Sequence, residues 1–262
     1  MKTLVRALLL LLATVAPAAA GQSAFTVRQL DDLVFHQHPG ATLPLGTPLV
    51  DEDGRSVKLG AFFGTRPVVV VLDYLHCQTL CGFVLSNLVG ALDHVPLAAG
   101  KDFEVLAISI DPRETPADSR AARAQYLART AHPGGWHFLT GTDDAVHRIA
   151  ATVGFPYLYD AAADQYAHPA GFAVAAPDGT IARYILGVDY PPLDLRLALT
   201  EAARGAISTP ATDLLLLCYC YDPATGRYSA EINTAMRILG GATALGLAAM
   251  LLRLSGVRLR RG

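Results

Sequence analysis

The sequence predicts an α/β fold, a sandwich of helices around a mixed central sheet. Two observations carry this prediction. Apolar, β-branched runs typical of buried strands alternate with segments whose apolar residues recur at helical spacing. The last two strands, in contrast, are separated only by a tight turn around Pro177–Asp178–Gly179, which makes them an antiparallel hairpin. Alternating units followed by a hairpin and a final helix give a sheet with both strand directions.

The first predicted elements lead to two cysteines. "PLVDEDGRSVKLG" (48–60) reads as a short hairpin with its turn at "DEDG". "RPVVVVLDY" (66–74) is a continuous β-branched run, the mark of a strand that is covered on both faces. After the cysteines, "FVLSNLVGALDHV" (83–95) has the apolar spacing of a helix.

The remaining elements follow in regular alternation. Thr115 with Pro116 marks the start of one helix, and Thr142 with Gly154 the start and end of another. The order of elements matches a thioredoxin-like domain with one additional helix and strand. The predicted ranges are a strand at 102–111, a helix at 115–130, a strand at 136–141, a helix at 142–154, the hairpin at 171–187 and a helix at 191–205.

Both ends of the chain have the composition of membrane-targeting segments. The N-terminus has two basic residues, an apolar run and "APAAA", the pattern of a secretory signal peptide. Near the C-terminus, an uncharged stretch is followed by four arginines, which predicts one transmembrane helix with a cytoplasmic tail. The expected organisation is a signal peptide at 1–20, an irregular segment at 21–44, the thioredoxin-like domain at 45–206, a connector at 207–235, a transmembrane helix at 236–257 and a tail at 258–262.

This organisation places the domain outside the inner membrane, facing the periplasm or the exterior and tethered by a single C-terminal span. The alternatives are an uncleaved N-terminal anchor and a buried or interfacial C-terminal helix. The formal net charge is −2, from 21 Lys and Arg against 23 Asp and Glu, and no basic block precedes the last ten residues. We therefore expect no nucleic-acid partner.

Cys77 and Cys81 form a C-x3-C pair between the predicted strand at 66–74 and the start of the next helix. Residues four apart on a helix share one face, and a helix N-terminus favours the thiolate. Four interpretations are open: a structural disulfide, a redox dithiol, a peroxidatic cysteine and a metal site. The first closes too short a loop to restrain the unfolded chain much. The third lacks the expected threonine, because Tyr74 and Gln78 stand three residues before the two cysteines.

Two thiolates alone make a soft site that suits Cu(I), and a third ligand has to come from elsewhere in the chain. The chain has eight histidines. His168 directly precedes the final hairpin, in the loop that lies over the cysteine-bearing helix in a thioredoxin-like topology. It is therefore the candidate third ligand, against the alternative of an ordinary buried polar residue. The other seven are interpreted as surface, packing or N-terminal residues.

Three stretches in order carry a resemblance to a known family. They are the C-x3-C segment, the "S-x-D-P-x-x-x-T-P" pattern of Ser109 to Pro116, and the single histidine before the "PDG" hairpin. Together they resemble the Sco/SenC family of copper-delivery proteins over about residues 45–205. The tail with "CYCYDPATGRY" is similar to a bacterial branch of that family with a C-terminal membrane anchor.

The resemblance implies that Cys77, Cys81 and His168 bind copper, as Cu(I) and in some states Cu(II). It also implies a carrier that assists assembly of the dinuclear copper centre of cytochrome c oxidase. The expected partners are the copper-site subunit of the oxidase and other periplasmic copper carriers or thiol reductants. The alternative is a membrane-tethered thiol–disulfide oxidoreductase, in which Cys77 attacks, Cys81 resolves, and a cis-proline usually faces the pair.

The chain departs from the family pattern around the candidate site. Gln78 and Gly82 stand where many members have proline, and Ala167 stands where many have an aspartate before the histidine. Asp73, four residues before Cys77, is interpreted as a strand-end residue that could add negative charge. A second pair, Cys218 and Cys220, is too closely spaced for an unstrained disulfide and is interpreted as free thiols, with an auxiliary thiol site as the alternative.

Overall fold

Strand β3 (Val68–Asp73) lies at the centre of the sheet, and all six of its residues are buried, as its valine run predicts. The computed structural model describes residues 33–75, 82–130 and 132–207, with residues 221–222, 227–228 and 243. The sheet that contains β3 has five strands in the order β5–β4–β3–β8–β9.

The sheet is mixed, which confirms the predicted fold class. β4 (Glu104–Ser109) pairs parallel with β3, and β5 (Trp136–Leu139) pairs parallel with β4. On the other side, β8 (Gly171–Ala175) runs antiparallel to β3, and β9 (Ile181–Leu186) antiparallel to β8. The carboxyl ends of β3, β4 and β5 and the beginning of β8 therefore lie at the same end of the strands.

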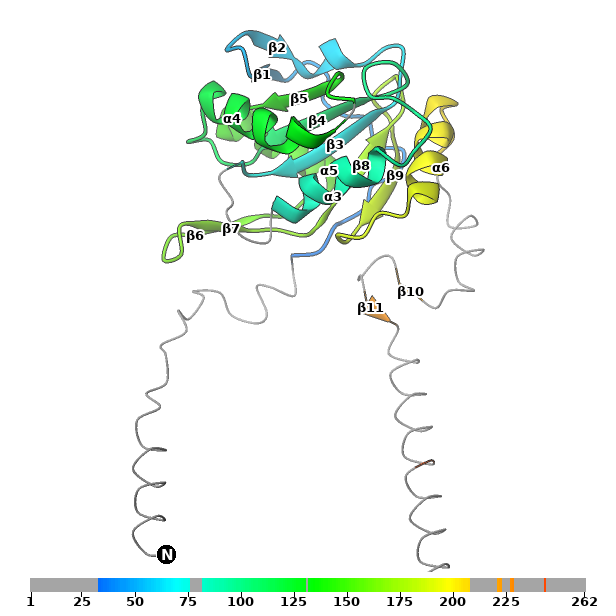
Figure 1. Cartoon of the computed structure of the whole chain (residues 1–262). Helices are drawn as coiled ribbons and strands as arrows, with labels where there is room; N and C mark the ends of the chain where they lie inside the picture. The colour runs from blue at the N-terminus through cyan, green and yellow to red at the C-terminus, as the bar shows by residue number, and fades with distance from the viewer. Residues whose placement is uncertain are drawn as a thin grey trace, which may run out of the picture.

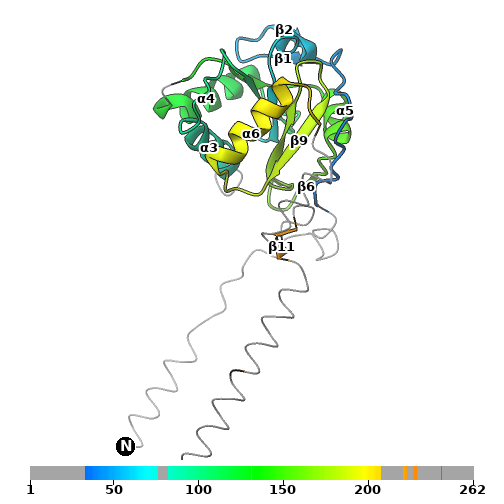
Figure 2. The same ribbon diagram turned by 90° about the vertical axis from the view of Figure 1, so that its right-hand side faces the viewer.

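Helices cover both faces of this sheet (Figures 1 and 2). Val69 and Val71 belong to the same buried cluster as residues of α3, α4 and α6, whereas Val70 and Leu72 belong to the cluster of α5. This alternation follows from the two-residue repeat of a strand. The helices are α3 (Gly82–Leu92), α4 (Pro116–Tyr126), α5 (Asp143–Val153) and α6 (Pro192–Ala203), with short 3-10 turns η1 (Leu59–Phe62) and η2 (Leu127–Arg129).

The predicted ends of α5 are confirmed. The Thr142 hydroxyl accepts a hydrogen bond from the Ala145 N–H, which caps the first turn. Gly154 ends the helix with a φ of 69°, and its carbonyl accepts the His36 N–H at 2.8 Å. A Cβ at Gly154 would lie 1.7 Å from the His36 carbonyl oxygen, so the approach of the N-terminal segment requires glycine here.

In the described part of the chain, three small hairpins accompany the main sheet. The first, β1 (Pro48–Val50) with β2 (Ser56–Lys58), is the predicted one. The second, β6 (Leu158–Asp160) with β7 (Gln165–Ala167), projects from the domain below the sheet in Figure 1 and was not predicted, because its strands are short and largely exposed. The third pairs β10 (Tyr221–Asp222) with β11 (Arg227–Tyr228).

Among the residues that the structure describes, no helix is both long and apolar enough to cross a membrane. The expected signal peptide at 1–20 lies outside those residues, and so does the expected transmembrane segment at 236–257 except for Thr243.

Candidate metal centre

The candidate site lies at the carboxyl end of β3, where ligand sites of open α/β sheets commonly form. The described chain runs to Leu75, and α3 begins at Gly82. Cys77 and Cys81 fall between these two points and lie outside the described residues, as do Cys218 and Cys220. Side chains from β3, from the turn after β4 and from the loop between β7 and β8 meet at the end of β3.

His168 lies beside the end of β3. Antiparallel pairing of β8 with β3 brings the start of β8 to this point, and His168 stands three residues before that start. Its side chain is only 5% exposed, and its ring centroid is 6.1 Å from that of Tyr74 and 5.4 Å from that of Phe155. The structure therefore holds the predicted third ligand against the strand that leads to Cys77.

The hydrogen bonding of His168 fixes which ring nitrogen carries a proton. Nδ1 lies 3.0 Å from the carbonyl oxygen of Pro169, which can only accept, so Nδ1 donates its proton there. Nε2 faces Oδ1 of Asp73 at 3.5 Å, and in the neutral ring it is the nitrogen that carries no proton. Metal-binding histidines commonly donate their second ring N–H to a backbone carbonyl in this way.

Asp73 is more than a strand-end residue. Its side chain is buried, and Oδ1 accepts the backbone N–H of Tyr74 at 2.8 Å while facing His168. Oδ2 is also buried and has no hydrogen-bond partner among the residues that the structure describes. Burial raises the pKa of Asp73, against the opposing effects of His168 and the Tyr74 N–H.

Glu114 ties the turn after β4 to the end of β3. Its Oε2 atom accepts the Ser109 hydroxyl at 2.6 Å and the backbone N–H of Leu75 at 3.0 Å. Leu75 is the last described residue before the C-x3-C segment. The Ser109 oxygen in turn accepts the Asp111 N–H at 3.0 Å. The motif that contains these residues therefore fixes the point from which the cysteine segment departs.

Arg113 joins the same turn to the β6–β7 hairpin. Its guanidinium group forms paired contacts with Asp111 at 2.6–3.0 Å, and Nη1 donates to Asp164 at 2.8 Å and to the Tyr159 hydroxyl at 3.1 Å. Although partial burial opposes the shift, the Arg113 contacts lower the pKa of Asp111. Because β7 ends one residue before His168, this cluster restrains the chain that carries the imidazole.

The sequence predicted that His168 lies before the final hairpin, and its role as a ligand stays a prediction, whereas the roles of Arg113 and Glu114 were not predicted. Both stand inside the recognised stretch from Ser109 to Pro116, so their place in that stretch was the available signal. Their contacts with Asp164 and Leu75 join segments distant in sequence, and nothing in the local pattern reveals such partners.

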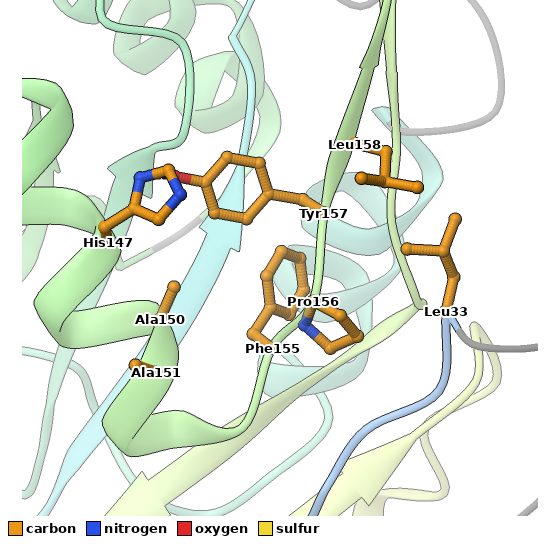
Figure 3. Close-up of a pocket in the computed structure, with 8 residues that line it drawn as sticks. All are labelled: Leu33, His147, Ala150, Ala151, Phe155, Pro156, Tyr157 and Leu158. Atoms are coloured by element: carbon orange, nitrogen blue, oxygen red, sulfur yellow. Dashed lines mark hydrogen bonds between the residues drawn. The ribbon is translucent and has the colours of Figure 1, made fainter. Parts of the chain in front are cut away.

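A separate cavity of about 340 Å³ lies between α5 and β6 (Figure 3). Tyr157 and His147 form part of its wall, with the tyrosine oxygen 2.8 Å from Nδ1 of the histidine. Phe155 also lines it and contacts His168, so the cavity adjoins His168, which is not among the described residues that line it. Among the described residues, no group of three or more His, Cys, Asp or Glu side chains is arranged to hold a metal ion.

The mixed sheet and the histidine at the carboxyl end of its central strand are consistent with a thioredoxin-like protein. The sequence matches the SCO1/SenC family model over residues 47–197. The chain belongs to the SCO1/SenC family. No curated protein sequence matches it.

Solved structures support the fold. A protein from Aquifex aeolicus VF5, named as a candidate electron transfer protein, is 26% identical with a TM-score of 0.58, covering 64% of this chain and 96% of that one. Arabidopsis thaliana ScoI, solved with copper bound, is 20% identical with a TM-score of 0.51, covering 62% and 99%. BsSco, a member of the Sco family of cytochrome c oxidase assembly proteins in which a disulfide switch was identified, is 18% identical with a TM-score of 0.50, covering 64% and 97%.

Proposed function

We propose that this protein is a copper carrier that assists assembly of the dinuclear copper centre of cytochrome c oxidase. Copper is its cargo, held by the sulfurs of Cys77 and Cys81 and by Nε2 of His168. The observation that carries the proposal is the position of His168, buried at the carboxyl end of β3 with Nδ1 bonded to a backbone carbonyl and Nε2 directed at Asp73. Membership of a family with a copper-bound relative, Arabidopsis thaliana ScoI, supports the choice of metal.

The donor set suits copper. Thiolates select Cu(I), and imidazole binds copper in either common oxidation state. A site with three protein ligands keeps an open side, from which a thiol of the receiving protein can displace one ligand at a time. We propose the copper-site subunit of the oxidase as that receiver, and other periplasmic copper carriers or thiol reductants as further partners.

We also propose that the domain faces the periplasm or exterior, anchored in the inner membrane by residues 236–257 after removal of residues 1–20. The apolar stretches and the arginines at 253–261 support this topology. An anchor would hold the carrier close to a membrane-bound receiver and raise its effective concentration there.

A second candidate, a thiol–disulfide oxidoreductase, is favoured by one observation. Helix α3 begins at Gly82, immediately after Cys81, and the N-terminus of a helix stabilises a nearby thiolate. The cis-proline that this alternative calls for does not occur in the described part of the chain, where every peptide bond is trans. The two functions differ in their need for the imidazole, because thiol exchange requires only the cysteines.

Anaerobic Cu(I) titration of the reduced full-length protein against a chromogenic chelator tests the proposal. We expect one Cu(I) per chain in the wild type, and a Kd at least about tenfold weaker after His168→Ala. His147→Ala removes an exposed histidine of α5 and serves as the matched control, with an unchanged Kd expected. Equal affinities for wild type and His168→Ala, with reductase activity lost only on cysteine substitution, would establish the oxidoreductase instead.

A further inference from the structure

The outer face of helix α6, at the front of Figure 2, carries exposed apolar side chains. Leu193 and Leu197 stand four residues apart, hence on one face of the helix, and are 56% and 42% exposed. Val188, in the loop that leads into α6, is 45% exposed. The opposite face of the helix packs on the sheet through four buried residues, Leu195, Ala198, Leu199 and Ala202. Exposed apolar side chains that gather on one face mark a contact surface, whereas scattered ones do not.

Two arginines belong to the same outer face. Arg196 stands three residues after Leu193, and Arg204, at the end of the helix, seven residues after Leu197, spacings that keep both on the side of the leucines. Both side chains are exposed, and neither forms a salt bridge with a residue that the structure describes. We call Val188, Leu193, Arg196, Leu197 and Arg204 the α6 patch.

The acidic residues of α6 lie on another flank of the helix. Glu201 accepts a hydrogen bond from Arg183 of β9 at 2.8 Å, so it faces the sheet edge and its charge is paired. Asp194 stands seven residues before Glu201 and shares that flank. Asp189 adjoins the patch only at its loop end. Exposed leucines beside unpaired arginines are the pattern of a helix face that contacts anionic lipid.

The order of segments keeps this face near a bilayer. Ile207 ends the described stretch that contains α6, and the expected membrane span begins 29 residues later, at position 236. Even fully extended, a chain of this length reaches no more than about 100 Å. Confinement of this kind raises the effective concentration of lipid at the domain, so a contact that is weak on its own suffices.

We propose that the α6 patch lies on the anionic surface of the membrane, with the leucines in the apolar boundary and the arginines against lipid phosphates. This inference rests on the proposed membrane topology and not on copper binding. It also orients the candidate site. Strand β9 ends at Leu186, which pairs with Gly171, three residues after His168, so the start of α6 and His168 lie at the same end of the domain. Membrane contact along α6 would hold that end beside a membrane-bound receiver.

A tryptophan introduced on the patch tests the contact. The chain has one tryptophan, Trp136, which is buried in β5 and serves as an internal reference. In full-length Leu193→Trp, reconstituted in phosphatidylcholine vesicles that contain phosphatidylglycerol with brominated acyl chains, we expect a blue-shifted emission that the bromines quench. Lys58→Trp, at an exposed position of β2, is the matched control and should not be quenched.

Charge reversal tests the role of the arginines. Each arginine near an anionic surface strengthens binding about fivefold, so adding Arg196→Glu and Arg204→Glu to Leu193→Trp should reduce the quenched fraction at least about threefold. The control adds Arg55→Glu and Arg148→Glu, which change the net charge equally at exposed positions of the β1–β2 turn and of α5. That control should leave the quenching unchanged.

The possible outcomes separate this inference from the proposed topology. Quenching that is equal in Leu193→Trp and Lys58→Trp, or absent from both while alkaline carbonate leaves the protein in the vesicles, would overturn the lipid contact and leave the anchor intact. A blue shift without quenching would mean that protein, such as a second copy of the chain, covers the patch instead of lipid, and would also overturn it. Loss of the protein from the vesicles in carbonate would overturn the topology itself.

Discussion

Removing the carboxylate of Glu114 should both destabilise the domain and loosen the candidate site. In Glu114→Ala, the Leu75 N–H loses its acceptor, at 3.0 Å in the wild type, and the Ser109 hydroxyl loses the nearer of its two acceptors, at 2.6 Å, and keeps the Asp111 carbonyl at 3.2 Å. Hydrogen bonds to a charged group contribute about 1.5–3 kcal/mol each, and a buried group left unpaired costs about 1–3 kcal/mol. Because the Leu75 N–H is only partly buried, we expect a total loss of about 2–4 kcal/mol in the free energy of unfolding.

Urea unfolding followed by circular dichroism measures this loss. In a separate thermal unfolding experiment, the melting temperature should fall by roughly 4–16 °C, at about 2–4 °C per kcal/mol for a domain of this size. Glu114→Gln keeps one oxygen as an acceptor and should lose less than half as much. The control is Glu201→Ala, which breaks the partly exposed ion pair with Arg183 and should cost about 0–1 kcal/mol.

The site itself should respond as well. Since Leu75 is the last described residue before the C-x3-C segment, Glu114→Ala should weaken Cu(I) binding several-fold, whereas Glu201→Ala should not. A Glu114→Ala protein as stable as the wild type, with the same Cu(I) Kd, would refute the view that Glu114 anchors the start of the cysteine segment.

Two further predictions concern the core and the turn after β4. Leu88→Ala, at a fully buried position of α3, should cost about 2–5 kcal/mol in urea unfolding, and a loss below about 1 kcal/mol would contradict the packing of α3 on the sheet. The pKa of Asp111 is lowered in the folded protein by Arg113, so its contribution to stability is complete above the ordinary value of 3.8 and is lost as the pH falls through the lowered pKa. Arg113→Ala should therefore have a lower free energy of unfolding than the wild type at pH 7, and should lose less of it than the wild type between pH 5 and pH 2. Parallel curves of unfolding free energy against pH over that range would contradict the view that Arg113 lowers the pKa of Asp111.

Much of the fold could be predicted because its signals are local. The valine run of β3, the caps of α5 and the turn at Pro177–Gly179 each determine their own structure, and the structure confirms them. The β6–β7 hairpin could not be predicted in this way. Its strands are three residues long and largely exposed, and the Arg113 contacts that restrain it come from the turn after β4.

The candidate site likewise has features that the local sequence predicts and features that depend on contacts between distant segments. The place of His168 before the final hairpin could be predicted because it follows from the order of elements alone, and its role as a ligand stays a prediction. The roles of Asp73 and Glu114 depend on which side chains meet when β3, β4 and β8 pair, and a carboxylate at a strand end gives no sign of its partner in the sequence. The expected roles of Cys77 and Cys81 stay predictions, since both lie outside the described residues.

The central claim is that the sulfurs of Cys77 and Cys81 and the imidazole of His168 bind one copper ion. Copper K-edge X-ray absorption of the reduced, Cu(I)-loaded full-length protein tests it most directly. We predict two sulfur ligands and one imidazole nitrogen in the wild type, with the imidazole signal lost in His168→Ala. A wild-type spectrum with sulfur ligands only, or one that His168→Ala leaves unchanged, would contradict this account.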